Sequence, residues 1–281
     1  MKTIAITGSS GFIGTHLLKR IKNEKFNIIA LDIRDGVDLM SEETIGKIES
    51  FDLLIHLAAR SFVPDSYIHP LSFFKTNYIL TLHALEMCRK QRAAMIYFSS
   101  YVYGKPAYLP IDENHPTDGF NPYAQSKLIG EELCLSYNRH FAVPVVIIRP
   151  FNIYGPGQDN RYLIPKIIHM ASTGMIELED PEPKRDFLHV NDVVDFIFRV
   201  VKKDFKMKSE IYNLGSGTSF AVDEIVKMIV DKKQISIKYK NNKRPNEISD
   251  VICNNTKAKL GFNWNSKAVF KEELLRLLKK K

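Results

Sequence analysis

Residues 2–21, KTIAITGSSGFIGTHLLKRI, carry three glycines three residues apart between two apolar segments. The first segment, residues 4–6, is short and rich in β-branched side chains, which predicts a strand buried on both faces. The second, residues 12–21, repeats its apolar side chains at helical spacing. The glycines therefore occupy a strand-to-helix turn. They are Gly8, Gly11 and Gly14.

A turn of this kind suits an anionic cofactor, because its unpaired backbone N–H groups and the positive end of the helix dipole converge on one point, which glycine lets a pyrophosphate approach. A second predicted strand, residues 26–32, ends in Asp32, which lies 18 residues beyond Gly14. Dinucleotide-binding units place a carboxylate at about this spacing to bind the adenosine ribose. A carboxylate repels a 2′-phosphate, so Asp32 favours NAD over NADP, although Arg34 could still bind that phosphate.

Three further apolar runs predict buried strands, and helical patterns separate them. Strands that alternate with helices predict a doubly wound parallel sheet with both faces covered, the Rossmann arrangement of the α/β class. The segment between residues 32 and 52 is short for a full strand and helix, so one crossover is expected to be abbreviated. The strand runs are residues 53–57, 94–98 and 143–148, and the helical patterns include residues 80–89 and 126–137.

The pattern changes after Pro150, where glycines and prolines punctuate shorter elements. Such punctuation is typical of a new structural unit. We expect an NAD-binding Rossmann domain over residues 1–150 and a smaller C-terminal α/β substrate domain over residues 151–281. Some segments of the second domain are expected to return to the sheet.

Composition and charge exclude several other classes of protein. Of the 281 residues, 44% are hydrophobic and 26% are charged, as in ordinary soluble proteins. No apolar stretch approaches the ~20 residues of a membrane span and the first residues do not resemble a secretion signal, so a cytoplasmic protein without a membrane partner is expected. The three cysteines lie far apart, which predicts neither a disulfide framework nor a metal site. The net charge of +8 is spread along the chain and does not indicate nucleic-acid binding.

The candidate catalytic pair is Tyr123 and Lys127 in the segment NPYAQSKLIGEELC. The two residues are four apart, so they share one face of the helix predicted to start near Pro122. Tyrosine has an ordinary pKa of about 10, and a neighbouring cation favours its phenolate form. Lys127 and a nicotinamide ring would therefore make Tyr123 a base near neutral pH.

Two serines complete the candidate constellation. Ser99 and Ser100 follow a predicted strand and precede the turn YVYGKP. They therefore lie at the carboxyl end of a parallel strand, where sheets of this kind bind ligands. A serine hydroxyl at that place could hold a substrate alcohol in line with Tyr123.

Further motifs follow one another along nearly the whole chain. They are Thr7 with the three glycines, Asp32, DL at Asp38, HLAA from His56, Asn77, SS…VYG from Ser99, Tyr123-x-x-x-Lys127, RPFNIYGPG from Arg149, RDFLHVNDV from Arg185 and RPNE from Arg244. In this order they resemble the extended short-chain dehydrogenases/reductases, and among these the NAD-dependent nucleotide-sugar epimerase/dehydratase family.

The resemblance implies a role for each matching residue. Those expected to bind the pyrophosphate, ribose and adenine of NAD are Gly8, Gly11, Phe12, Ile13, Gly14, Asp32, Asp38 and Leu39. Those expected to line the rest of the cofactor groove are Leu57, Ala58, Ala59, Asn77, Tyr123, Lys127 and Pro150. Those expected to contact the nucleotide sugar are Ser100, Asn152, Leu163, Arg185 and Arg244. Family members commonly dimerise through the helix that carries the tyrosine and lysine, which implies a homodimer.

The chain also departs from the family pattern. Its turn SSYVYG is one residue shorter than usual, so Ser99 and Ser100 compete for the catalytic role, and counting from the strand favours Ser100. Family dehydratases carry an Asp-Glu pair where Tyr101 and Val102 stand, which argues against a 4,6-dehydratase. Tyr162 replaces an asparagine found in some 4-epimerases, so the nucleotide and the sugar stay open.

Together with these residues, the resemblance implies an NAD-dependent oxidoreductase of nucleoside-diphosphate sugars. In the expected reaction Tyr123 removes the proton from the sugar O4 while C4 gives a hydride to NAD. Return of the hydride to the other face of the 4-keto sugar would make the enzyme a 4-epimerase. The alternative is a 4-ketoreductase that starts from a 4-keto-6-deoxyhexose and reduced cofactor. His56, beside a buried strand end, is expected to be a core residue.

Overall fold

The computed structural model describes residues 1–203, 209–230, 235–240, 242 and 247–279. The chain forms two compact units, called here the sheet unit and the C-terminal unit. The sheet unit comprises Met1–Gly104, Pro116–Pro150 and Val194–Tyr212, and the C-terminal unit comprises Lys105–His115, Phe151–Val193 and Asn213–Lys281.

A six-stranded sheet forms the centre of the sheet unit, in the order β2-β1-β3-β4-β5-β9. Every pairing from β2 to β5 is parallel, as the alternation of strands and helices predicted. The strands are β1 (Lys2–Thr7), β2 (Phe26–Leu31), β3 (Leu53–His56), β4 (Ala94–Phe98), β5 (Val145–Pro150) and β9 (Glu210–Leu214).

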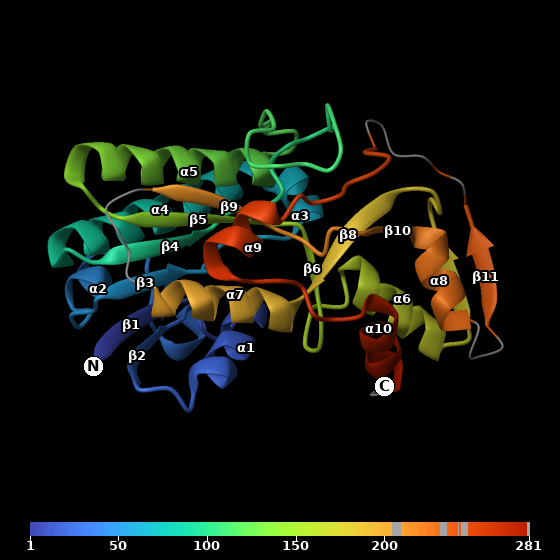
Figure 1. Cartoon of the computed structure of the whole chain (residues 1–281), viewed down its shortest axis with the longest axis horizontal. Coiled ribbons are helices and arrows are strands. Elements are labelled where there is room, and N and C mark those ends of the chain that lie inside the picture. Colours follow the sequence, from blue (N-terminus) through green and yellow to red (C-terminus); the bar gives the residue numbers. More distant parts are fainter. Residues whose placement is uncertain (204–208, 231–234, 241, 243–246, 280–281) are drawn as a thin grey trace. The chain divides into compact units, whose positions relative to one another are not determined.

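The strand order reverses at β1, which pairs with β2 on one side and with β3 on the other (Figure 1). The ends of these strands are in register, because Thr7 is opposite Leu31 in β2 and His56 in β3. Parallel sheets bind ligands beside the carboxyl ends of their strands at such a reversal. The glycine turn that follows Thr7 therefore stands at the place where the fold favours a cofactor.

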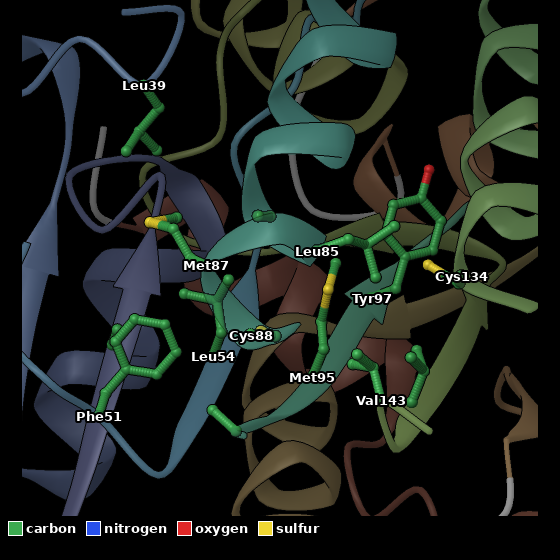
Figure 2. Packing of buried hydrophobic residues seen from close by; sticks show 14 of the residues in the cluster. Leu39, Phe51, Leu54, Leu85, Met87, Cys88, Met95, Tyr97, Cys134 and Val143 are labelled. Carbon is green, nitrogen blue, oxygen red and sulfur yellow. The ribbon is translucent and has the colours of Figure 1, made fainter. Parts of the chain in front are cut away.

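One face of the sheet is covered by α4 (Pro70–Gln91) and α5 (Pro122–Phe141). Figure 2 shows the side chains of this layer, with Tyr97 of β4 close to Cys134 of α5 and Leu85 and Met87 of α4 facing the strands. Alternate strand residues such as Leu54 and Met95 belong to the same apolar cluster. Burial of this cluster fixes both helices against the strands that end at the candidate site.

The opposite face of the sheet is covered by α1 (Phe12–Ile21) and by α7 (Val190–Lys202) (Figure 1). The guanidinium of Arg20 in α1 lies 3.7 Å from the ring centroid of Phe198 in α7. Between β2 and β3, where every residue is described, the chain forms only a 3-10 turn (Ile33–Asp35) and the short helix α2 (Glu42–Gly46). The prediction of an abbreviated crossover is therefore confirmed.

The last predicted strand begins two residues later than its apolar pattern indicated. Ala142 adopts a left-handed conformation, with φ 56°, and its N–H donates to the carbonyl of Asn138 at the end of α5. Val143 is still part of this helix end, since its N–H bonds to the carbonyl of Tyr137. The strand therefore starts at Val145, after Pro144.

The C-terminal unit contains two small sheets and helices that pack on them. One sheet has the order β10-β8-β6, and the other pairs β11 with β7 in parallel. Apolar side chains of α6, α8 and α10 form one buried cluster. The elements are β6 (Asn152–Tyr154), α6 (Leu163–Ser172), β7 (Met175–Leu178), β8 (Lys184–His189), β10 (Ser219–Ala221), α8 (Val222–Val230), β11 (Ser236–Tyr239), α9 (Thr256–Phe262) and α10 (Phe270–Lys279). Over the described ranges, none of the helices combines the length and the apolar character that a membrane span requires.

Candidate active site

The glycine turn after β1 is too tightly packed for side chains at two of its positions. Gly8 has φ +68°, a conformation that favours glycine, and a Cβ there would lie 2.8 Å from the backbone nitrogen of Ala58. A Cβ at Gly14 would lie 2.4 Å from the carbonyl oxygen of Gly8. Gly11 is the N-cap of α1 and offers no side chain to cap the helix. The start of α1 can therefore present its backbone N–H groups to a pyrophosphate, so this cradle fits a dinucleotide.

Thr7 joins the glycine turn to the end of β3. Its hydroxyl oxygen accepts hydrogen bonds from the backbone N–H groups of Leu57 and Ala58, each at 3.2 Å, and lies 2.8 Å from Nδ1 of His56. Burial, helped by the positive charge of Lys127, lowers the pKa of His56 to about 3. His56 is therefore a neutral core residue, as predicted, and Thr7 fixes the predicted cofactor residues of the β3 end.

Asp32 follows β2 directly and is bonded to the glycine turn. Its carboxylate accepts the backbone N–H of Ser10 at 3.1 Å and that of Arg34 at 3.0 Å. The Arg34 Nε lies 3.3 Å from the same carboxylate, although the arginine side chain is 64% exposed. The carboxylate thus stands beside the turn, where a ribose contact is predicted, and carries an arginine that could meet a phosphate.

The two residues predicted to contact adenine, Asp38 and Leu39, are both held by hydrogen bonds within the protein. The side chain of Leu39 lies in the apolar cluster under α4, and its carbonyl oxygen is 2.8 Å from Nδ1 of His83. The Asp38 carboxylate accepts the backbone N–H of Met40 at 2.9 Å. The remaining predicted cofactor residues occupy element ends of the sheet unit. Phe12 and Ile13 open α1, Ala59 follows β3, and Pro150 is the last residue of β5.

Both the oxygen and the nitrogen of the Asn77 side-chain amide, on α4, form hydrogen bonds with other protein groups. Its Oδ1 accepts the backbone N–H of Arg60 at 2.8 Å, while its Nδ2 donates to the Arg60 carbonyl at 3.1 Å and to the Ser126 hydroxyl at 2.8 Å. The Ser126 hydroxyl in turn donates to the carbonyl of Tyr123 at 2.7 Å. The described contacts of Asn77 therefore connect the loop after β3 to the first turn of α5, which its sequence motif alone did not reveal.

The helix that carries the candidate pair begins where the sequence predicted. Asn121 is the N-cap, since its side chain accepts the backbone N–H of Ala124 at 2.8 Å, and Pro122 occupies the first turn. Tyr123 and Lys127 follow one turn apart on this helix. Tyr123 is half-buried, whereas Lys127 is only 4% exposed.

Lys127 lies in apolar surroundings beside Tyr97 of β4. Its Nζ is 4.6 Å from the ring centroid of Tyr97, and the Tyr97 hydroxyl donates to the Lys127 carbonyl at 3.2 Å. Burial lowers the pKa of Lys127 to about 8, against opposing contributions from Cys134 and Glu131. A buried ammonium favours the charged form of a phenol placed near it.

The two candidate serines have different surroundings. Ser99 is buried, with 2% of its surface exposed, and its hydroxyl donates to Oε1 of Glu131 at 2.5 Å. Ser100 is half-buried, and its hydroxyl forms no hydrogen bond with the part of the chain that the structure describes. The geometry thus leaves Ser100, rather than Ser99, available to an incoming hydroxyl group.

Sequence reasoning missed a buried ion pair beneath these residues. Glu131 of α5 and Arg149 of β5 are 3% and 5% exposed, and the Arg149 Nη2 lies 2.6 Å from Oε2 of Glu131. The spacing of Glu131 four residues after Lys127 was the one available signal. A buried ion pair cannot be inferred from that spacing alone, because its partner is on a different element.

Apart from Ser100, the residues predicted to contact the nucleotide sugar belong to the C-terminal unit. Asn152 donates from Nδ2 to the carbonyl of Asp186 at 3.1 Å. The guanidinium of Arg185 donates to the carbonyl of Ile248 at 2.7 Å and pairs with the carboxylate of Glu247. Leu163 is the first residue of α6, where it packs at the border of the apolar cluster, and Arg244 lies outside the described residues. Across the described chain, no group of three or more His, Cys, Asp and Glu side chains is placed to hold a metal ion.

Comparison with known proteins identifies the family of the chain. The family model described as the NAD dependent epimerase/dehydratase family matches residues 4–215. The chain belongs to the NAD-dependent epimerase/dehydratase family. The predicted family, enzyme class and NAD dependence are thereby confirmed.

Individual relatives of this epimerase/dehydratase chain have several activities. A UDP-glucose 4-epimerase of Pisum sativum is 29% identical, over 94% of this chain and 91% of the relative. A GDP-6-deoxy-D-mannose reductase of Pseudomonas aeruginosa is 30% identical, over 83% and 80%. The solved structure of RMD from Pseudomonas aeruginosa, complexed with NADPH, has a TM-score of 0.89 and 28% identity over 99% of this chain and 98% of that one. The doubly wound α/β fold predicted from the sequence is confirmed.

Proposed function

We propose that the protein is an NAD-dependent 4-epimerase of a nucleoside-diphosphate hexose, acting through a 4-keto sugar. The observation that carries this proposal is the position of Lys127, buried and one helical turn from Tyr123 on α5. A lysine with a lowered pKa beside a tyrosine is an arrangement suited to moving a proton from a sugar hydroxyl.

NAD, held by the glycine turn and Asp32, would supply the acceptor for the hydride of the sugar C4 and the donor that returns it. Tyr123 accepts the proton of the O4 hydroxyl as its base and gives it back when the carbonyl is reduced. Lys127 stabilises the phenolate by its charge, and Ser100 donates a hydrogen bond to the sugar O4. The buried Tyr97 ring under the Lys127 ammonium keeps water away from this charge.

Two observations favour epimerisation over net reduction. An epimerase regenerates its oxidant in each cycle and therefore suits NAD, which the carboxylate of Asp32 favours beside the glycine turn. The UDP-glucose 4-epimerase of Pisum sativum also matches nearly the whole chain.

We assign the nucleoside diphosphate to Asn152, Arg185 and Arg244, because two guanidinium groups suit a diphosphate. Binding would require the anion to replace or join Glu247 at Arg185.

The second candidate is a 4-ketoreductase of a nucleoside-diphosphate 4-keto-6-deoxyhexose. Two observations favour it: the similarity to a GDP-6-deoxy-D-mannose reductase and the exposed Arg34 paired with Asp32, which could turn to a 2′-phosphate. The same Tyr123 would then donate a proton to O4 while reduced cofactor supplies the hydride. The two candidates share one site and differ in the oxidation state of substrate and cofactor.

We further infer a homodimer formed through α4 and α5. These helices expose large apolar side chains on the described surface, with Leu71 79%, Tyr78 41% and Phe141 53% exposed. Exposed apolar side chains on two neighbouring helices are a feature of many interfaces. Light scattering of the purified protein, compared with a Leu71→Glu/Tyr78→Glu variant, should show a dimer that the variant weakens.

The reaction is tested by incubating the enzyme with UDP-, GDP-, CDP- and dTDP-hexoses without added reduced cofactor, and then with 4-keto-6-deoxy sugars and NADH or NADPH. We expect inversion at C4 of at least one hexose without net change of cofactor. Tyr123→Phe serves as the control and should bind NAD but not invert the sugar. Consumption of reduced cofactor by a 4-keto sugar, with no hexose inverted, would favour the second candidate.

A further inference from the structure

The buried ion pair of Glu131 and Arg149 lies directly under the residues to which we assign catalysis. The Arg149 Nε is 3.0 Å from Oε1 of Glu131 and its Nη2 is 2.6 Å from Oε2, so the two groups meet in a two-point contact. Glu131 stands on α5 one turn beyond Lys127, and Arg149 precedes Pro150 at the carboxyl end of β5. The pair therefore joins the catalytic helix to a strand end at the predicted cofactor groove.

Two further hydrogen bonds extend the pair to the remaining parts of the site. The Ser99 hydroxyl donates to Oε1 of Glu131 at 2.5 Å, and Nη1 of Arg149 donates to the Tyr103 hydroxyl at 3.0 Å. Ser99 follows β4 and Tyr103 belongs to the turn after it, and both residues are buried. One network of four side chains thus binds the end of β4, the following turn, α5 and the end of β5.

Stability alone is a poor explanation for such a network. Removing two charges from water costs several kcal/mol per ion in general, and well-packed apolar residues of the same volume are often equally stable. What this pair does provide is geometry, because both carboxylate oxygens of Glu131 and all three guanidinium nitrogens of Arg149 have a defined partner. The conformation of Ser99 is one consequence. With its hydroxyl held inward by Glu131, the neighbouring Ser100 is the serine that stays accessible.

The pair also determines the charge around Lys127. The groups that face Lys127 from the described elements are His56 of β3, Tyr97 of β4, and Tyr123, Glu131 and Cys134 of α5. Burial makes His56 neutral, and burial likewise raises the pKa values of Tyr97 and Cys134 well above their ordinary ones. Apart from the proposed base itself, Glu131 is therefore the charged neighbour of Lys127, and Arg149 balances its charge.

We propose that Glu131 and Arg149 are positioning residues of the catalytic site: together they hold Ser99 inward so that Ser100 meets the substrate, and Glu131 cancels the charge of Arg149 near Lys127. The proposal rests on the proposed function, because it gives Ser100, Tyr123 and Lys127 their catalytic roles. It adds two residues that touch neither substrate nor cofactor and act through Ser99 and Lys127.

The central test compares the pH profiles of kcat/KM of Glu131→Gln, Arg149→Met and the double variant. Glutamine keeps an acceptor for Ser99 but leaves the charge of Arg149 unbalanced. The pH at which kcat/KM declines on the alkaline side should therefore be about one unit lower in Glu131→Gln than in the wild type. Arg149→Met should not move the alkaline decline to lower pH, because it leaves no uncompensated cation. The double variant should return the decline close to its wild-type pH. A decline that stays at lower pH in the double variant, or no shift in Glu131→Gln, would overturn the electrostatic part.

Because an unbalanced buried charge destabilises the fold, Ser99→Ala tests the geometric part by itself. It leaves both charges in place and removes only the hydroxyl held by Glu131. We expect kcat to fall severalfold without movement of the alkaline decline, and less than in Ser100→Ala. The geometric part would be overturned if Ser99→Ala kept the wild-type kcat, or if it lost more kcat than Ser100→Ala. Glu43→Gln is the matched control, because it breaks the exposed pair of Glu43 with Lys47 and should change neither quantity.

A readout without turnover separates this inference from the proposed reaction. Ionisation of Tyr123 can be followed by difference absorbance of each variant against its Tyr123→Phe counterpart, with no sugar present. Glu131→Gln should lower the pH of that ionisation, and the double variant should restore it. If these shifts appear while no sugar is converted, the network stands and the proposed reaction fails. If sugars are converted but the shifts are missing, the network proposal fails alone.

Discussion

Gly130 of α5 lies so close to Tyr97 of β4 that a Cβ at this glycine would stand 2.0 Å from the Tyr97 hydroxyl oxygen. This approach allows the hydroxyl to bond the carbonyl of Lys127 at 3.2 Å and sets the ring under the Lys127 ammonium. The glycine therefore fixes the depth at which α5 packs on the sheet.

Gly130→Ala should accordingly be destabilising, because the Tyr97 ring is fully buried and cannot move away. Overpacking of this kind costs about 1–3 kcal/mol, which urea denaturation would measure. We expect kcat to fall as well, since α5 must shift. Gly46→Ala is the control, because a Cβ there would meet no atom within 4 Å. Equal stability of both variants would show that the contact is not restrictive.

The lowered pKa of Lys127 predicts a limit to activity at high pH. The lysine is charged below its pKa of about 8 and neutral above it, so the charge that supports the Tyr123 phenolate is lost as pH rises. We expect kcat/KM, which reports the free enzyme, to decline above about pH 8. In Lys127→Met this limb should disappear together with most of the activity. A profile that stays flat to pH 10 would contradict the assigned role.

Tyr123→Phe should lose about 10² to 10⁴ in kcat while its affinity for NAD changes little, because only the proton transfer is removed. Isothermal titration with NAD measures the affinity, and sugar inversion measures the rate. A variant that loses NAD binding to the same degree would point to a structural role for the hydroxyl. Retained turnover would remove Tyr123 from the mechanism.

Asp32 should make the enzyme prefer NAD. We expect NAD(H) to bind at least tenfold more tightly than NADP(H), because the carboxylate repels a 2′-phosphate. Asp32→Ser removes that repulsion and releases Arg34 from its ion pair, so the preference should narrow or reverse. Asp35→Ser is a suitable control, since Asp35 accepts from the Ser10 hydroxyl but is not the predicted ribose ligand. Tighter binding of NADP(H) by the unaltered enzyme would mean that Arg34 dominates.

Much of the fold could be predicted, because the alternation of buried strands and helical patterns depends on local sequence. The glycine turn, the start of α5 after Asn121 and the short crossover after Asp32 all carry their signals in adjacent residues. The predicted strand ends were less accurate. The strand predicted from residue 143 begins at Val145, because the left-handed backbone of Ala142 ends α5 just before it. Ordinary residues adopt that conformation only where the surrounding structure imposes it.

The support of the candidate site could not be predicted, because it depends on contacts between distant elements. Glu131 and Arg149 are eighteen positions apart on a helix and a strand, and nothing in their local sequence shows that their charges are buried together. The same holds for Asn77, whose motif suggested a cofactor contact but whose amide bonds Arg60 and Ser126. The choice between Ser99 and Ser100 likewise became clearer only when Glu131 was seen to hold Ser99.

The proposed hydride transfer is tested by following the hydrogen at C4 of the sugar. A nucleoside-diphosphate hexose that the enzyme inverts is prepared with deuterium at C4 and incubated in ordinary water without added reduced cofactor. The proposed mechanism moves this hydrogen as a hydride and returns it within the same turnover, so the inverted product should retain its deuterium fully, as mass spectrometry and NMR can show. Loss of the deuterium to water would contradict the mechanism, and so would the absence of inversion in every nucleotide series together with stoichiometric oxidation of NADH or NADPH by a 4-keto sugar.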